Sequence, residues 1–430
     1  MLASSPRPEV AVDAAWTSRL LECLPSPSGD LETEQRRGRE ALARQPLPSR
    51  RQEDWRFTDL APLKALDPAG MAAVSTAVGS APLPPPPDPT LLPEPAAGSL
   101  RLWLDGRSDP LAGQSLPPGL SLLSGEDLHQ ALGRTLACCG CGQHWPVQLN
   151  QATASHCLAL RVSGSIAETL ELVSVADRLH TLTPVRLLLL LEEKASLEVL
   201  QVQLGSGPSL SSLVVEVQLG RQAQLLHGML AIGEADACFL GHLAVEQASD
   251  SRFRSVMACR GWGLSRFEPR IVQAEGAAHT ELKALQLAER DQLADTHSQV
   301  RFLGPDGALE QLHKAIADGR ARSVFNGAVA VPRLAQRTNA NQMSRNLLLS
   351  DQARIDTKPE LEIVADDVRC THGATVSRLQ ADQLFYLQSR GIDAATASRL
   401  LKRGFCQEVL RDLPAAAAVW NPLQRLMAEV

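Results

Sequence analysis

The sequence predicts a mainly β protein, with an all-β body and a helical region at each end. From about residue 147 to 376, short apolar runs such as "TLELVSV" and "SLVVEVQL" recur at intervals of roughly 8 to 12 residues, a spacing typical of all-β bodies. Many runs place apolar residues on alternate positions, as Leu213, Val215 and Val217 do, which is the period of a strand with one buried face. The intervals leave little room for crossover helices, which excludes Rossmann and TIM-barrel folds.

The pattern of the body, residues 147–376, is consistent with a β-sandwich, a β-barrel or a β-solenoid. Consecutive one-sided strands slightly favour the solenoid, in which stacked coils share one core. The runs follow no strict coil repeat, so the pattern alone leaves the three architectures open.

Residues 1–146 are predicted to form an N-terminal helical region that includes a linker. The run "AAWTSRLLECL" has helical spacing, and "DLETEQRRGREALARQPLP" continues it with Asp30 as the expected N-cap. The segment "APLPPPPDPTLLPEPAAG", at about 81–98, is too rich in proline for a helix interior or a central strand. It is expected to be an extended, semi-rigid linker.

Residues 377–430 are predicted to form a C-terminal helical domain. The first helix ends near Gly391, and the second begins after Asp393 as its N-cap. These residues are too few to bury an adequate hydrophobic core on their own. The domain should therefore pack on the β body or offer an apolar face to a partner. The apolar face of its second helix comprises Ala397, Leu400, Leu401, Phe405 and Val409.

Composition limits the classes of partner and the compartment. The net charge of −6 argues against nucleic acid, because phosphate binding needs clustered basic residues. No run approaches the ~20 apolar residues of a membrane span, and the start lacks the pattern of a secretory signal, so a cytoplasmic protein is expected. Nine cysteines, an odd number in a chain of 430 residues, are expected to be reduced thiols.

The stretch "LEIVADDVRCTHGATV", residues 361–376, contains the main candidate site. Residues two apart in a strand share a face, so Cys370 and His372 are aligned as metal ligands. Thiolate and imidazole suit zinc, iron or copper, but a closed structural site needs four ligands. Asp366, Asp367, another strand or a second chain would have to complete it. Alternatively, Cys370 is a small core residue and His372 a hydrogen-bonded residue at a strand end.

Other clusters give weaker signals. Cys138, Cys139, Cys141 and His144 lack the paired C-x₂-C spacing of zinc sites, so we interpret them as an adventitious loop cluster. The "GSGPS" run lacks the ending of a phosphate-binding loop and reads as a turn. Without paired acids, a phosphate-binding loop or a dinucleotide fingerprint, the sequence favours a non-catalytic protein over an enzyme that uses Cys370 and His372.

Residues 341–392, from "NQMSRNLLLS" to "FYLQSRGI", resemble the signature region of the SufB/SufD family of iron–sulfur cluster assembly proteins. The N-terminal run "RRQEDWRFTDL" and the form "THGATV" resemble the SufD branch of that family. The resemblance implies a right-handed parallel β-helix for residues 147–376. It also implies a non-catalytic subunit in a complex with a SufB-like scaffold and a SufC-like ATPase, to which ATP binding would belong.

The resemblance further implies roles for particular residues. His372, with Cys370 beside it, would lie at the interface with SufB, where iron or a nascent iron–sulfur cluster is held transiently. The C-terminal helices would dock SufC through Phe385, Tyr386, Arg390, Leu401 and Phe405. A homodimer is a further possibility. The alternative function is a structural or interaction β-solenoid protein with no metal role.

Overall fold

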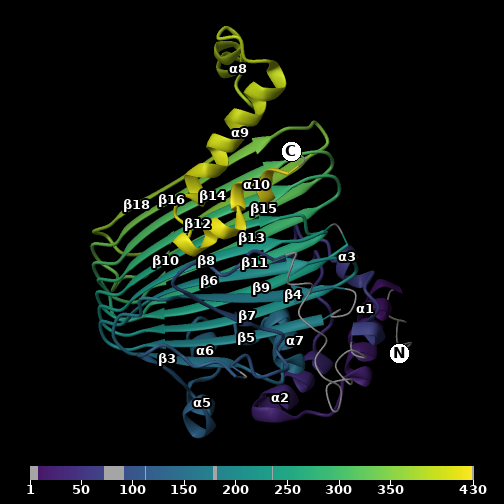
Figure 1. Cartoon of the computed structure of the whole chain (residues 1–430), viewed down its shortest axis with the longest axis vertical. Coiled ribbons are helices and arrows are strands. Elements are labelled where there is room, and N and C mark those ends of the chain that lie inside the picture. Colours follow the sequence, from purple (N-terminus) through teal and green to yellow (C-terminus); the bar gives the residue numbers. More distant parts are fainter. Residues whose placement is uncertain (1–7, 72–91, 112, 178–181, 235, 429–430) are drawn as a thin grey trace, which may run out of the picture.

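The computed structural model of the chain describes residues 8–71, 92–111, 113–177, 182–234 and 236–428. Its strands form two nine-stranded sheets, and the chain alternates between them through the body. The pairing is parallel except between β2 and β3. Each coil therefore adds one strand to each sheet (Figure 1). The prediction of a mainly β protein with a parallel β-solenoid body and helical ends is confirmed.

Sheet A contains β1 (Ser99–Trp103), β4 (Thr169–Ala176), β6 (Ser196–Gly205), β8 (Gln224–Ile232), β10 (Arg252–Arg260), β12 (His279–Ala288), β14 (Ala308–Ala317), β16 (Asn339–Leu348) and β18 (Arg369–Ser377). Sheet B contains β2 (Leu120–Leu122), β3 (Leu158–Val162), β5 (Leu182–Leu191), β7 (Leu210–Leu219), β9 (Cys238–Gln247), β11 (Leu264–Gln273), β13 (Leu293–Phe302), β15 (Arg322–Val331) and β17 (Arg354–Ile363). Because β1 and β2 pair with strands of the body, the sheets begin upstream of the boundary we predicted at residue 147.

The core lies between the two sheets and is built from columns of like side chains. Leu187, Val215 and Leu243 are register partners on β5, β7 and β9, and all three are buried in one apolar cluster. Burying such a side chain stabilises a fold by about 1.5–3 kcal/mol. The alternate apolar positions seen in the sequence are thus the residues that point into the core in successive coils.

Towards the C-terminal end of the solenoid, the inward columns become polar. Gln342 donates from Nε2 to Oε1 of Gln311 at 2.8 Å, and Gln311 in turn donates to Ser298 at 2.7 Å. His313 lies 3.2 Å from Oε1 of Gln286 and stacks on Phe325. These buried groups are hydrogen-bonded across coils, which offsets much of the cost of removing them from water.

The N-terminal helices cover the outer face of sheet B. They are α1 (Pro8–Cys23), α2 (Glu32–Arg44), α3 (Ala61–Lys64), α5 (Gly125–Ala131), α6 (Arg134–Cys138) and α7 (Trp145–Thr153). Apolar residues of α1, α2 and α7 pack with the first residues of five strands of that sheet. Both faces of these strands are therefore buried, which explains the five consecutive leucines, 187–191, at the end of β5. Most of the predicted linker, up to residue 91, lies outside the described residues.

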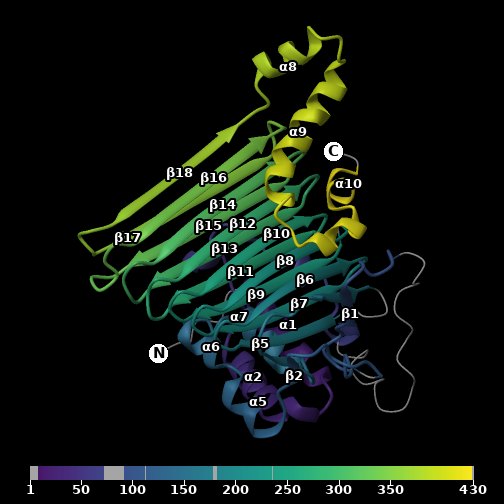
Figure 2. The ribbon, with the colours of Figure 1, turned by 60° about the vertical axis from the view of Figure 1, so that its left-hand side comes forward.

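The C-terminal helices are α8 (Ala381–Gln388), α9 (Ala394–Leu410) and α10 (Pro422–Met427). Apolar residues of α9, α10 and the 3₁₀ turn Ala415–Trp420 pack on the outer face of sheet A. A Cβ on Gly228 of β8 would lie 2.3 Å from Cδ of Pro414, so only glycine allows this close approach. The α8 helix projects past the end of the sheets, as Figures 1 and 2 show. Among the described residues, no helix has the length and apolar character to cross a membrane.

Candidate functional site

The last coil of the solenoid leaves two strand edges open. In the described part of the chain, β17 pairs only with β15, and β18 pairs only with β16. The backbone N–H of Arg369 donates to the carbonyl oxygen of Thr338, the residue just before β16, at 2.9 Å. Neighbouring residues of a strand point their N–H groups to opposite sides, so Cys370 and His372 direct theirs to the open edge. An open parallel edge is a template for a further strand.

Cys370 and His372 lie together on the inward side of β18. Cys370 is the register partner of buried Ala340 and packs partly against the core. His372 is the partner of Gln342, which is buried on the preceding coil, but His372 itself is exposed because no coil follows. The sequence prediction of a shared face therefore agrees with the geometry. The two side chains continue the inward columns at the end of the stack, where a partner could reach them.

These two residues offer only part of a metal site. Partial burial raises the pKa of the Cys370 thiol, so this sulfur is mainly protonated at neutral pH until a metal displaces the proton. Within the described residues, no third Cys, His, Asp or Glu joins them in a compact group of ligands. The aspartates considered from the sequence, Asp366 and Asp367, are not part of such a group. Any closed site would need donors from elsewhere.

Apolar side chains are exposed at the same end of the molecule. Val364, in the turn after β17, is 56% exposed, and Val376 on β18 is 47% exposed. Ile363 is also exposed. Exposed apolar residues beside two open edges are typical of a surface that a partner covers.

The N-terminal run "RRQEDWRFTDL" docks on the outer face of sheet B near this end. Trp55 is buried, and the guanidinium of Arg266 lies 3.9 Å from its ring centroid. Glu53 accepts a hydrogen bond from Lys358 of β17 at 2.9 Å. This contact joins the two segments on which the family resemblance depends, although they are about 300 residues apart. Trp55 therefore has a packing role.

The residues predicted to dock a partner fall into two groups. Phe385 and Tyr386 on α8 are 72% and 58% exposed, and α8 has no buried residue. Arg390 follows α8, with its guanidinium 5.2 Å from the Tyr386 ring centroid. In contrast, Leu401 and Phe405 on α9 are half-buried. Phe405 packs towards the body, where Nζ of Lys314 lies 3.8 Å from its ring centroid.

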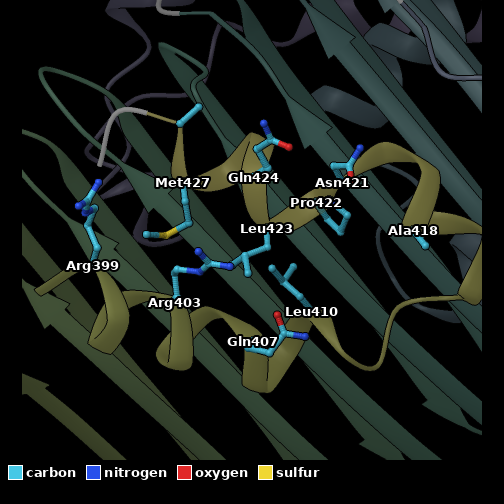
Figure 3. Close-up of a pocket in the computed structure, with 11 residues that line it drawn as sticks. Arg399, Arg403, Gln407, Leu410, Ala418, Asn421, Pro422, Leu423, Gln424 and Met427 are labelled. Carbon is cyan, nitrogen blue, oxygen red and sulfur yellow. The ribbon is translucent and has the colours of Figure 1, made fainter. Parts of the chain in front are cut away.

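A groove of about 710 Å³ separates α9 from α10. Figure 3 shows Arg403 and Leu410 on one side of this groove, with Leu423 and Met427 on the other. Its cationic and apolar lining suits a partner segment that carries both acidic and apolar residues. The sequence did not predict it, because the groove depends on how two helices pack.

The cysteine-rich run before α7 is divided by the fold. Cys139 and Cys141 are buried in an apolar cluster with Leu136 and Val147, and burial raises the pKa of the Cys141 thiol to about 12. His144 instead lies beside His242 and Glu268, and no motif or spacing in the sequence links these three residues. In the described residues these three side chains are the only compact group of potential metal ligands.

Comparison with known proteins identifies the class of protein to which this solenoid belongs. Residues 174–405 match the model described as SUF system FeS cluster assembly, SufBD core domain. An iron–sulfur cluster assembly SufBD family protein of Synechocystis is 35% identical over 391 residues, which cover 86% of this chain and 85% of the relative. The iron–sulfur cluster assembly protein SufD of Escherichia coli is 28% identical over 392 residues, 86% of each chain. The chloroplastic protein ABCI7 of Arabidopsis thaliana is 37% identical over 233 residues, 53% of this chain and 49% of that one. This chain belongs to the SufBD family.

Proposed function

We propose that this chain is the SufD-type subunit of a complex with a SufB-type scaffold and a SufC-type ATPase. Family membership supports a role in iron–sulfur cluster assembly. The observation that carries the more specific proposal is the last coil, where Cys370 and His372 lie beside two open strand edges. In this proposal the chain is non-catalytic, and the ATPase subunit hydrolyses ATP. The cytoplasmic location stays a prediction.

The open edge of β18 would receive a strand of the SufB-type partner. A strand that adds to this edge would pair with the free backbone groups of Cys370 and His372 and place its own side chains beside theirs. It would cover exposed apolar residues such as Val376. Because a homodimer could use the same edge, the two assemblies would compete for it.

The bound species would be cargo, either iron or a nascent iron–sulfur cluster in transit. His372 would be the main ligand from this chain, because its imidazole is exposed and needs no rearrangement to bind a metal. Cys370 would contribute after deprotonation. Since four ligands complete a closed site, the partner would supply the remainder.

The SufC-type ATPase would dock on α8 and the adjoining C-terminal helices. Phe385, Tyr386 and Arg390 form the exposed part of this surface, while Leu401 and Phe405 support it by packing. The α8 helix has no buried residue of its own, which is a poor arrangement for a helix that stays free in water. An ATPase bound there would be mechanically linked, through α9, to sheet A.

The test is anaerobic cluster reconstitution in a complex co-purified from this chain and its candidate SufB-type and SufC-type partners. His372→Ala should lower the amount of bound cluster, read from visible absorbance and iron content, several-fold while the complex still forms. Cys370→Ser should lower it less. The matched control is His279→Ala, on the same sheet but away from the open edge.

Two results would contradict separate parts of the proposal. Unchanged cluster yield in His372→Ala would eliminate the ligand role and leave the structural alternative, an interaction protein with no metal role. Failure of the unmodified chain to bind either partner would eliminate the complex itself.

A further inference from the structure

A compact group of metal-ligating side chains lies under the N-terminal helices, away from the open edge. Glu268 on β11 and His242 on β9 are direct register partners and face the same way from sheet B. His144 immediately precedes α7, which packs over this face of the sheet. The fold therefore brings together two residues of neighbouring strands and one from the loop before α7, and the two histidines are 98 residues apart in the sequence.

The three ligand atoms form a nearly equilateral triangle. Nδ1 of His144 lies 3.2 Å from Nε2 of His242 and 3.3 Å from Oε2 of Glu268, and the remaining side is 3.2 Å. Ligand atoms that share one metal ion at bond lengths of about 2.0–2.1 Å with tetrahedral angles lie about 3.3–3.4 Å apart. The triangle thus has the dimensions of three positions of one coordination shell.

Hydrogen bonds among these three atoms cannot satisfy all of them at once. With both imidazoles neutral, either two N–H groups face each other or a nitrogen lone pair faces the Glu268 carboxylate. A cation placed against all three atoms would be attracted by every lone pair at once. We infer that His144, His242 and Glu268 form a binding site for a divalent transition metal ion.

The surroundings fit an exchangeable ion. Glu268 and His242 are buried, whereas the His144 side chain is 28% exposed. His144 and Glu268 both line a pocket of about 370 Å³, which also includes Gln52 and Asp54. An ion can therefore enter, and water can fill its remaining positions. Two imidazoles with one carboxylate favour zinc, iron or cobalt over calcium or magnesium.

Two arginines orient the carboxylate and also limit how tightly a cation binds. Arg266 donates to Oε1 of Glu268 at 2.7 Å, and Arg270 donates to Oε2 at 2.8 Å. These contacts leave Oε2 one lone pair for a metal. Asp295, 2.6 Å from Arg266, offsets part of the positive charge. The site is accordingly a reversible one, weaker than a structural zinc centre.

The experiment measures Zn²⁺ binding to the full chain after chelator treatment, by competition with a fluorescent zinc indicator. The unmodified chain should bind zinc with a component that His144→Ala weakens at least tenfold. His156→Ala, a half-buried histidine outside the triangle, should leave that component unchanged. Equal zinc binding by the unmodified chain and His144→Ala would overturn the proposal, as would no binding at all.

A second measurement needs no variant and therefore survives a folding defect in His144→Ala. X-ray absorption of the chain loaded with one equivalent of zinc should show nitrogen or oxygen ligands at about 2.0–2.1 Å with imidazole scattering. A dominant sulfur shell at about 2.3 Å would place the zinc on cysteines and overturn the assignment. Both measurements use the isolated chain, so they stand apart from the proposed role of His372.

Discussion

At the scale of single residues, two buried histidines inside the solenoid make the stability of the fold depend on pH. Nε2 of His227 donates to Gln201 at 2.6 Å, and Nε2 of His313 lies 3.2 Å from Oε1 of Gln286. Burial lowers the pKa of His227 to about 4 and that of His313 to about 3. Each imidazole is therefore held neutral in the folded chain at pH values where an unfolded histidine is already charged.

We expect the free energy of unfolding to fall as the pH drops below about 6.5, the ordinary pKa of histidine. Above that pH both states are neutral, whereas below it only the unfolded state takes up protons, until the folded pKa is reached. Each histidine then contributes a slope of about 1.4 kcal/mol per pH unit. Urea unfolding of His313→Gln should show a shallower pH slope than the unmodified chain. His279→Gln, outside the core, should keep the original slope, and an unchanged slope in His313→Gln would refute this assignment.

At the scale of elements, α8 and α9 differ in how far they are buried. Phe385 on α8 is largely exposed, whereas Phe405 on α9 packs beside Lys314 over sheet A. The sequence prediction that both belong to one docking surface treats them alike. The two residues differ in burial in the structure, so substituting each of them is expected to have a different effect.

Phe385→Ala should weaken binding of the SufC-type ATPase about tenfold or more and leave the melting temperature of the isolated chain unchanged. Phe405→Ala should lower the free energy of unfolding, by less than the ~3–5 kcal/mol of a fully buried phenylalanine. Titration calorimetry and thermal unfolding of both variants check this. Retained ATPase affinity in Phe385→Ala would move the docking surface away from α8, towards the groove between α9 and α10.

At the scale of the whole molecule, the solenoid has chemically different ends. The N-terminal helices lie over the outer face of sheet B and pack on β5 to β13, while β17 and β18 end the stack with open edges and exposed Val364 and Val376. A stacked fold gains core with each coil, so its last coil needs either a cap or a partner. The described residues place no cap on this end.

Val376→Lys should weaken assembly with the SufB-type partner at least tenfold, because a covered interface would have to bury the new charge. The control is Leu122→Lys on β2, a comparably exposed apolar residue on the edge strand of sheet B at the opposite end of the solenoid. Analytical ultracentrifugation of the mixed subunits measures the difference. Equal effects of the two substitutions would mean that the open edge of β18 is not the interface.

Part of the coil repeat was present in the sequence but could not be recognised there. Residues with positive φ recur at one corner of the solenoid at intervals of 27 to 31 residues: Lys194, Gln222, Asp250, Ala277, Asp306 and Arg337. Their side chains differ, and none is glycine, so composition does not mark the turn. Neighbouring coils impose this conformation by hydrogen bonds such as Lys194 N–H to Arg221 O at 2.8 Å.

The sequence by itself indicated an all-β body, the inward parity of its apolar runs, the helical ends and the family, because apolar alternation and short signature segments are local properties of the chain. It also predicted that Cys370 and His372 share a face. Only the tertiary structure decided that β18 ends the stack, that α8 stays exposed, and that His144 meets His242 and Glu268. Those outcomes depend on which coil lies next to which and on what covers each face, and contacts across 30 to 100 or more residues leave no periodic signal in the sequence.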